Sequence, residues 1–197
     1  KAASEVKIEQ LIVVSSINAL LHGTGELTAD THNHRIKQTL SKVYKQQYNL
    51  NSKVFCLTNI YGPHSSEENG FIPFIIQKCY NALISNENII LTGNKNHKRD
   101  FMFVKDANHL IEQFYNNNIT FLSNPIKFYT GVTYTLEEIV NIIIELMDFK
   151  GKVIWSGEYD SITNKTFIDD NKSINYKFTS IYKGISETIN YFKENLD

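Results

Sequence analysis

The stretch SKVFCLTNIYGPH, residues 52–64, decides which fold to expect. Its first part, 53–58, has the β-branched, aromatic and apolar composition of a buried strand. The polar pair Thr58 and Asn59 stands at the end of this strand, and the turn-forming residues YGP follow. In α/β sheets, the side chains just beyond the carboxyl ends of the strands are the ones that handle ligands. The pair could also be an ordinary strand end, so the rest of the sequence is needed to show whether it marks a ligand site.

Strands and helices alternate on both sides of this stretch. QLIVVSS (10–16) is a continuous apolar run that ends in serines, which is typical of a strand buried on both faces. Further strands are predicted at 88–92, 100–104, 127–131 and 152–156, and helices at 32–48, at 70–85, from about 104, at 135–151 and at 179–195. Alternation of this kind predicts an α/β fold with a largely parallel sheet.

The clearest single element is the helix in YTLEEIVNIIIELMDFKG, residues 134–151. Thr135 and Glu138 have the spacing of a capping box, in which each side chain bonds the other residue's backbone N–H. An apolar stripe at intervals of three and four residues follows, as on a helix with one buried face. Gly151 is expected to end the helix, because glycine favours the left-handed conformation found there.

Composition excludes several classes of protein. The chain has 197 residues, with 20 basic and 21 acidic side chains and a net charge of −1, which argues against a nucleic-acid or membrane-surface protein. No apolar run approaches the roughly 20 residues of a membrane span, and the first residues lack the pattern of a signal peptide. A cytoplasmic location is therefore expected. Cys56 and Cys79 lie in apolar runs and are expected to be reduced core thiols.

The basic, turn-rich loop that begins GNKNHKRD (93–100) allows two interpretations. Arg99 and Asp100 could form a surface ion pair of little energetic value. Alternatively, the planar guanidinium of Arg99 could bind a phosphate. The histidines and cysteines match no zinc spacing, so no metal site is predicted. HGTGE (22–26) has neither of the glycine-rich nucleotide-binding patterns and is expected to be a loop.

Taken in chain order, these stretches resemble the extended short-chain dehydrogenase/reductase family of nucleotide-sugar enzymes. The resemblance covers nearly the whole chain. It rests on TNIYGPH, on the YKQQY motif that precedes it, on the helix FIPFIIQKCYNA, on GNKNHKRDFMFVKDANHLI, on the late helix and strand and on the final helix SIYKGISETINYFKEN.

This resemblance implies the fold and the ligands. Residues 1–62 are expected to form the C-terminal half of a Rossmann-like parallel sheet, and residues 63–197 a smaller mixed α/β nucleotide-sugar domain. Family members hold the pyrophosphate of NADP with a Gly-rich turn at the start of their first half, which is expected to be absent from these residues. The resemblance thus implies NADP as the cofactor and a GDP-sugar as the ligand, with NADP in doubt for this chain.

The resemblance also assigns binding residues. It places Asn59 at the junction of cofactor and substrate, which answers the question posed by the polar pair. It places Phe71, Lys78 and Arg99 where family members contact the nucleotide diphosphate. A lysine or an arginine is usual at the position of Lys78, and either answers a phosphate charge.

The catalytic positions depart from the family. Its chemistry needs a Tyr and a Lys four residues apart on a helix, so that the Lys lowers the pKa of the phenol that exchanges a proton with the sugar carbonyl. Counted back from Asn59 without gaps, these positions hold Asp30 and His34. The strand serine of the family is retained as Ser15. An acid/base cysteine and a histidine of the family are replaced by Ile17 and Gly70, which cannot titrate.

Two functions remain open on this basis. The chain could be a non-catalytic relative that acts as a binding or structural subunit. Alternatively, it could be an active epimerase-reductase whose cofactor half is supplied by another segment or a partner. In either case, residues 1–60 contain an apolar strand that lacks the neighbours it has in the family, so another chain or a second copy is expected to cover them.

Overall fold

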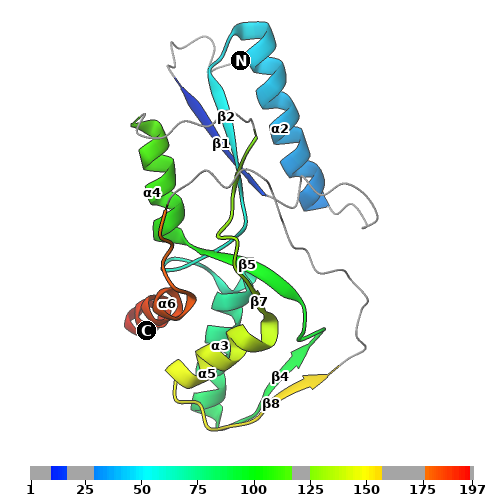
Figure 1. The fold of residues 1–197 in the computed structure, drawn as a ribbon. Coiled ribbons are helices and arrows are strands. Elements are labelled where there is room, and N and C mark those ends of the chain that lie inside the picture. The colour runs from blue at the N-terminus through cyan, green and yellow to red at the C-terminus, as the bar shows by residue number, and fades with distance from the viewer. Residues whose placement is uncertain (1–9, 17–28, 117–124, 157–175, 196–197) are drawn as a thin grey trace. The chain divides into compact units, whose positions relative to one another are not determined.

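The computed structural model of the protein describes residues 10–16, 29–116, 125–156 and 176–195 (Figure 1). These residues divide into two compact units. Unit 1 draws on Lys1–Thr58 and Leu110–Tyr129, and unit 2 on Asn59–His109 and Thr130–Asp197. The predicted boundary lies between residues 62 and 63. The observed division falls between Thr58 and Asn59, inside the TNIYGPH motif, and Leu110–Tyr129 also belong to unit 1.

Unit 1 is a parallel sheet with a helix packed on it. The strand order is β1-β2-β6, and Leu11 to Ser16 of β1 pair in register with Ser52 to Leu57 of β2. Helix α2 packs on β1 and β2 (Figure 1). Phe55 stacks on Phe128 and meets the ring of Phe114 edge-on, so aromatic contacts fill the unit's core. The elements are β1 (Leu11–Ser16), α2 (Ala29–Tyr48), β2 (Ser52–Leu57), β6 (Ile126–Phe128) and the later part of α4 (Val104–Tyr115).

Unit 2 contains two small sheets and three longer helices. One sheet has the order β3-β5-β7, in which β3 and β5 are parallel and β7 is antiparallel; the other pairs β4 with β8 in parallel. Its elements are β3 (Asn59–Tyr61), a 3₁₀ turn (Glu67–Asn69), α3 (Phe71–Ser85), β4 (Ile89–Thr92), β5 (Lys98–Phe103), β7 (Thr133–Thr135), α5 (Leu136–Leu146), β8 (Val153–Ser156) and α6 (Ile181–Asn195).

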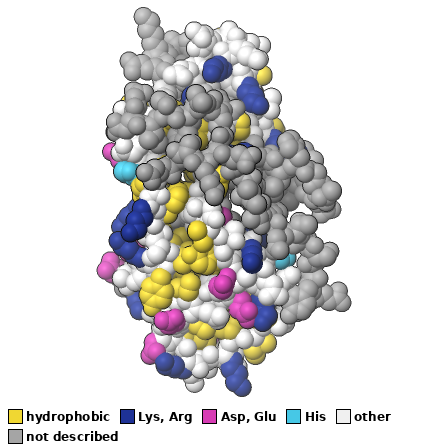
Figure 2. Space-filling view, viewed as in Figure 1, with side chains coloured by type: hydrophobic (Ala, Val, Ile, Leu, Met, Phe, Trp, Pro, Cys, Tyr) yellow, Lys and Arg dark blue, Asp and Glu magenta, His cyan; other side chains and the backbone are white. Residues whose placement is uncertain are grey.

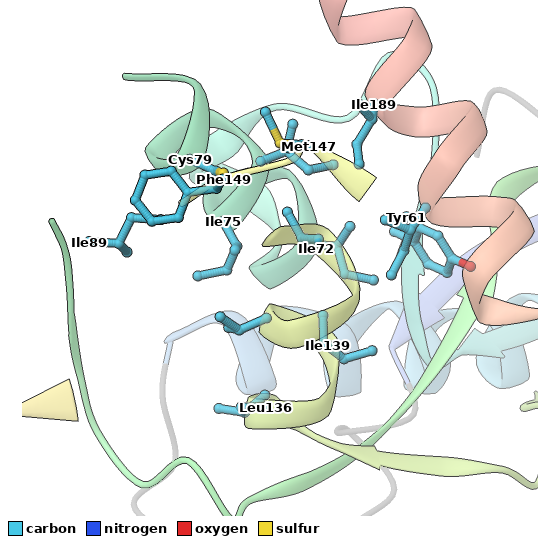
Figure 3. Packing of buried hydrophobic residues seen from close by; sticks show 14 of the residues in the cluster. Tyr61, Ile72, Ile75, Cys79, Ile89, Leu136, Ile139, Met147, Phe149 and Ile189 are labelled. Carbon is cyan, nitrogen blue, oxygen red and sulfur yellow. The ribbon is translucent and has the colours of Figure 1, made fainter. Parts of the chain in front are cut away.

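The core of unit 2 lies between its helices and β3, β4 and β5. The inner sides of α3 and α5 face each other there, and α6 contributes Ile185 and Ile189. Figure 3 shows this packing, with Ile72, Ile75 and Ile139 close to one another. These side chains are almost fully buried, so the rotation of α3 about its own axis is set by the core.

The Tyr-Gly-Pro turn is built around two close approaches. Gly62 has a φ of +149°, and a Cβ on it would collide with the side chain of Val104. The ring of Tyr61 passes against Gly184 of α6, where a Cβ would collide with the Tyr61 hydroxyl. The turn motif therefore fixes the contact of α6 with β3 and β5, and a glycine is needed on each side of it.

The predicted α/β fold with a largely parallel sheet is confirmed. The capping box is confirmed too: the Glu138 N–H donates to Thr135 Oγ1 at 3.1 Å, and the Thr135 N–H donates to Glu138 Oε2 at 2.6 Å. The predicted helix end at Gly151 is wrong. The helix ends at Leu146, and Asp148 takes the left-handed conformation with a φ of +53°, while Gly151 leaves room for the ring of Phe149.

No helix in the described part of the chain is long and apolar enough to cross a membrane.

Candidate functional site

Ser15, the serine that the resemblance assigns to the catalytic strand, is held in a buried polar network in unit 1. Its side chain is 3% exposed. Gln38 Nε2 donates to Ser15 Oγ at 3.2 Å, and Ser15 Oγ lies 3.3 Å from His34 Nδ1 and 3.4 Å from the His34 carbonyl oxygen. Because one turn of α2 separates residues 34 and 38, both side chains face the end of β1.

His34 is oriented by the backbone of β1. The Ser16 N–H donates to His34 Nδ1 at 3.2 Å, so Nδ1 acts as an acceptor in this contact. The structure thus brings together Ser15 and His34, the residues predicted at two of the family's catalytic positions. It does so with the imidazole accepting hydrogen bonds at Nδ1, which differs from the donating ammonium of the family's lysine.

Cys56 extends the network into β2. Gln38 Nε2 lies 3.3 Å from Cys56 Sγ, and burial raises the pKa of the Cys56 thiol to about 11. The group is therefore a protonated core thiol at neutral pH and a poor nucleophile. Cys79, in unit 2, is also free and buried, as predicted for both cysteines.

Of the other positions that the resemblance assigns to catalysis, two lie partly or wholly outside the described residues. Asp30 lies in the first turn of α2, four residues before His34, and its side chain is outside the described part of the structure. Ile17 also lies outside the described residues. Gly70 precedes α3 with an extended backbone, and an added Cβ would press on the ring of Pro73.

Asn59, the residue predicted at the junction of cofactor and substrate, lies at the start of β3 in unit 2. Its Nδ2 donates to the carbonyl oxygen of Asp100 at 2.8 Å, which links the first residue of β3 to β5. Asn59 therefore makes a structural hydrogen bond to β5, and this bond sets the orientation of its side-chain amide.

Asp100 is buried and accepts several hydrogen bonds through its carboxylate. The backbone N–H groups of Thr130 and Gly131 donate to it at 3.0 Å and 2.8 Å, and Thr130 Oγ1 donates at 2.9 Å. Arg99, its neighbour, is exposed, and partial desolvation lowers the pKa of the guanidinium. The Asp100 carboxylate thus anchors the 130–131 turn, and Arg99 presents its charge from the other face of the strand.

Phe71 and Lys78 lie two turns apart on α3, so they share one side of the helix. Phe71 packs against the core of unit 2. Lys78 Nζ lies 5.3 Å from the centroid of the Phe74 ring, one turn earlier. Arg99 lies on β5, and the contacts of the described residues join it neither to Phe71 nor to Lys78. The predicted diphosphate-binding residues are therefore all in unit 2 without direct contact between Lys78 and Arg99.

Asp106 is a buried carboxylate that the sequence analysis did not single out. It accepts hydrogen bonds from the Tyr176 hydroxyl at 2.8 Å, from the Thr179 N–H at 2.9 Å and from Thr179 Oγ1 at 2.9 Å. Burial, followed by the bond to Asp106 and its charge, raises the pKa of Tyr176 to about 12. The only sequence signal was an acid in the first turn of α4, which every helix favours.

A second contact reaches the last helix from the end of the turn motif. His64 has a φ of +66°, and its Nδ1 lies 2.7 Å from the Tyr191 hydroxyl. The two rings are also in contact, with centroids 4.5 Å apart. Tyr61, His64 and Asp106 thus hold α6, or the segment just before it, against the rest of unit 2.

The described residues hold no cluster suited to a metal ion, and the face drawn in Figure 2 carries charges of both signs. Among the described residues, no group of three or more His, Cys, Asp or Glu side chains could hold a metal ion. Figure 2 shows exposed hydrophobic side chains on one face, with basic and acidic side chains interspersed around them. On the face shown, this pattern does not resemble the concentrated basic patch of a nucleic-acid-binding protein.

The sequence pattern of the NAD dependent epimerase/dehydratase family matches residues 33–120, so this part of the chain is similar to that family. The match includes α2, β2, the TNIYGPH motif and α3, which are the elements that carry most of the predicted site residues.

The chain is similar in sequence to GDP-L-fucose synthases. It is 26% identical over 178 residues to the GDP-L-fucose synthase of Dictyostelium discoideum, covering 83% of this chain and 53% of the relative. It is 24% identical to that of Escherichia coli (strain K12), covering 80% and 54%. The chain therefore spans about half the length of the curated relatives it matches.

Solved structures share the fold. A GDP-L-fucose synthetase from Naegleria fowleri bound to NADP matches with a TM-score of 0.84 at 18% identity, over 98% of this chain and 66% of the other. A UDP-glucose 4-epimerase from Thermotoga maritima with UDP-glucose matches with a TM-score of 0.79 at 14% identity, over 99% and 67%. The predicted fold class and the family resemblance are thus both confirmed.

Proposed function

We propose that this chain is a nucleotide-sugar-binding homologue of GDP-L-fucose synthases that does not itself perform their epimerase-reductase chemistry. The observation that carries the proposal is the buried network around Ser15. Its hydroxyl accepts from Gln38 and lies against His34, whose Nδ1 in turn accepts from the Ser16 N–H. A catalytic hydroxyl has to be available to a substrate carbonyl, and this one is 3% exposed.

The replaced residues support the same proposal. Proton transfer to a sugar carbonyl needs an acid that holds its proton at neutral pH, as a phenol does and an ordinary aspartic acid does not. Asp30 is at the position of that phenol. The neighbouring lysine of the family supplies a positive charge. His34, at the position of that lysine, instead accepts a hydrogen bond from the backbone of β1. Gly70 has no titratable group at the position of a further acid/base residue.

NADP supplies the hydride in the family, and a Gly-rich turn holds its pyrophosphate. These 197 residues contain no G-x-G-x-x-G pattern, and Asn59 is engaged with the backbone of Asp100. We therefore propose no hydride step for this chain and expect calorimetric titration with NADPH to give no binding in the micromolar range.

Nucleotide-sugar binding is proposed for unit 2. Phe71, Lys78 and Arg99 supply an apolar side chain and two cations on a fold that related proteins use for nucleotide sugars, including UDP-glucose. Because both GDP-sugar and UDP-sugar enzymes are among the similar proteins, the ligand class is a nucleoside diphosphate sugar.

An active enzyme is the second candidate, with the rest of its active site supplied by a partner or another segment. It is favoured by the retention of the family's strand serine as Ser15 in β1. A turnover assay with NADPH and GDP-4-keto-6-deoxymannose, together with calorimetric titration of GDP-mannose, separates the two candidates. The first predicts binding without turnover.

Residues 1–60 are proposed to be covered by a protein partner or a second copy of the chain. Ile36, Leu40 and Tyr48 of α2 are 54%, 50% and 50% exposed, and Val14 of β1 is 49% exposed. Ile36 and Leu40 lie one turn apart and Tyr48 two turns further along α2, so the three side chains expose apolar surface along the helix, here called its apolar ridge.

A further inference from the structure

Helix α3 carries one charged side chain, Lys78. Its sequence, FIPFIIQKCYNALIS, contains no Asp, Glu or Arg. In the described part of the chain no carboxylate forms an ion pair with Lys78, whereas Lys95 and Lys105 pair with Glu137 and Glu187.

The partner that Lys78 does have is an aromatic ring. Phe74 lies one turn earlier on α3, and the Lys78 Nζ is 5.3 Å from its ring centroid, within the range of a cation–π interaction. Phe74 is 37% exposed although it is a large apolar side chain, and Lys78 is half-buried. Since Ile72, Ile75 and Cys79 fix the helix in the core, both side chains leave the helix in set directions.

We propose that Phe74 is a positioning residue, which holds the Lys78 ammonium ready for the diphosphate of a nucleotide ligand. This inference rests on the proposed nucleotide-sugar function of unit 2 and adds a residue to it. A lysine side chain loses considerable rotamer freedom when it is fixed on an anion. A ring that already restrains the ammonium reduces that cost at the moment of binding.

The chemistry of the restraint matters as much as its geometry. A carboxylate in the place of Phe74 would neutralise the ammonium and compete with the phosphate for it. The face of a phenyl ring attracts a cation through its quadrupole and takes up none of the three N–H donors as a carboxylate would. Phe74 thus orients the charge and leaves it available to an anion.

A double-mutant cycle measured by calorimetric titration of GDP tests this role. Phe74→Leu should weaken GDP binding by about two- to fivefold, the range expected for losing one exposed cation–π contact. Phe74→Tyr keeps a ring and should bind as the wild type does. In the Lys78→Met background, Phe74→Leu should have no further effect. Leu83→Ala, an exposed apolar side chain on the same helix, is the matched control and should change nothing.

A second measurement needs no ligand. After reductive ¹³C-methylation, which keeps the charge of each lysine, the Lys78 methyl signal should carry a ring-current shift that Phe74→Leu removes. An unshifted signal in the wild type would overturn the proposal. Equal weakening by Phe74→Leu with and without Lys78 would also overturn it, because it would place the ring on the ligand directly.

These experiments distinguish a failure of the proposed nucleotide-sugar function from a failure of the proposed role of Phe74. A ring-shifted Lys78 signal in a chain that binds no GDP or UDP would overturn the nucleotide-sugar function, and the diphosphate role of Phe74 with it. GDP binding that Phe74→Leu leaves unchanged would overturn the role of Phe74 alone and leave the proposed function standing.

Discussion

Ser15 Oγ lies 3.3 Å from His34 Nδ1, and that nitrogen accepts a hydrogen bond from the backbone N–H of Ser16. Two residues that stand at catalytic positions by family resemblance are therefore in contact, but they are arranged as a structural pair. The His34 imidazole accepts from the strand through Nδ1, and the serine hydroxyl accepts from Gln38 and donates to the His34 carbonyl oxygen. This arrangement joins α2 to β1 where the family needs an open site.

The first prediction concerns Gln38, the donor that joins β1, α2 and β2. Gln38→Ala should lower the free energy of unfolding by about 1–3 kcal/mol, because it leaves the buried Ser15 hydroxyl without its donor and opens a cavity. Urea denaturation followed by circular dichroism measures this. Gln46→Ala, the same change at an exposed position of α2, should cost less than about 0.5 kcal/mol. Equal effects of the two changes would show that the network contributes nothing.

A second prediction tests the contact between Tyr61 and Gly184. Gly184→Ala should destabilise the chain by about 1–3 kcal/mol, since the new methyl group collides with the Tyr61 hydroxyl. In a Tyr61→Phe background the same change should cost clearly less, because the colliding oxygen is gone. Thermal unfolding of the four chains gives the coupling. Strict additivity of the two changes would contradict the predicted collision.

The third prediction is a pH dependence. The pKa of Tyr176 is raised from 10 to about 12 in the folded chain, so above pH 10 the folded state holds a proton that the unfolded state releases. Its contribution to stability is complete below pH 10 and is lost as the pH rises through about 12. Tyr176→Phe should therefore show a smaller fall in melting temperature between pH 9 and pH 11 than the wild type. Tyr115→Phe, at an exposed position, is the control and should follow the wild type.

The fourth prediction concerns the apolar ridge of α2. Size-exclusion chromatography with light scattering should find the purified chain larger than its monomer mass of 22.7 kDa. Replacing Ile36 and Leu40 by serine should shift it towards the monomer, because they are two of the three large apolar side chains of the ridge. A wild-type chain that stays monomeric at high concentration would contradict coverage by a second copy.

Local signals in the sequence predicted the elements that local interactions define. The capping box of Thr135 and Glu138 begins α5 as expected, and the long apolar runs became β1 and β2. The short strands β3 and β7 were not predicted. Each has three residues, and only pairing with β5, some 40 and 35 residues away in the chain, makes it a strand.

The site was predictable to a similar extent. Family resemblance identified Ser15 and His34, and α-helical periodicity explains why residues 34 and 38 face the same strand. The direction of the His34 ring depends on the backbone N–H of Ser16, eighteen residues earlier in the chain, and no sequence pattern encodes such a bond. Asp106 was missed for a related reason, because its partners Tyr176 and Thr179 lie more than sixty residues later.

The central claim is that the chain binds a nucleotide sugar without turning it over. The most direct measurement follows NADPH absorbance with GDP-4-keto-6-deoxymannose and the full 197-residue chain, at concentrations where GDP-mannose binding is saturated. The account predicts a rate equal to that of buffer for the wild type, and no change on substituting Ser15, Asp30 or His34 by alanine. Turnover by the wild type that Asp30→Ala or His34→Ala abolishes would contradict it, because these residues would then have taken over the proton transfer.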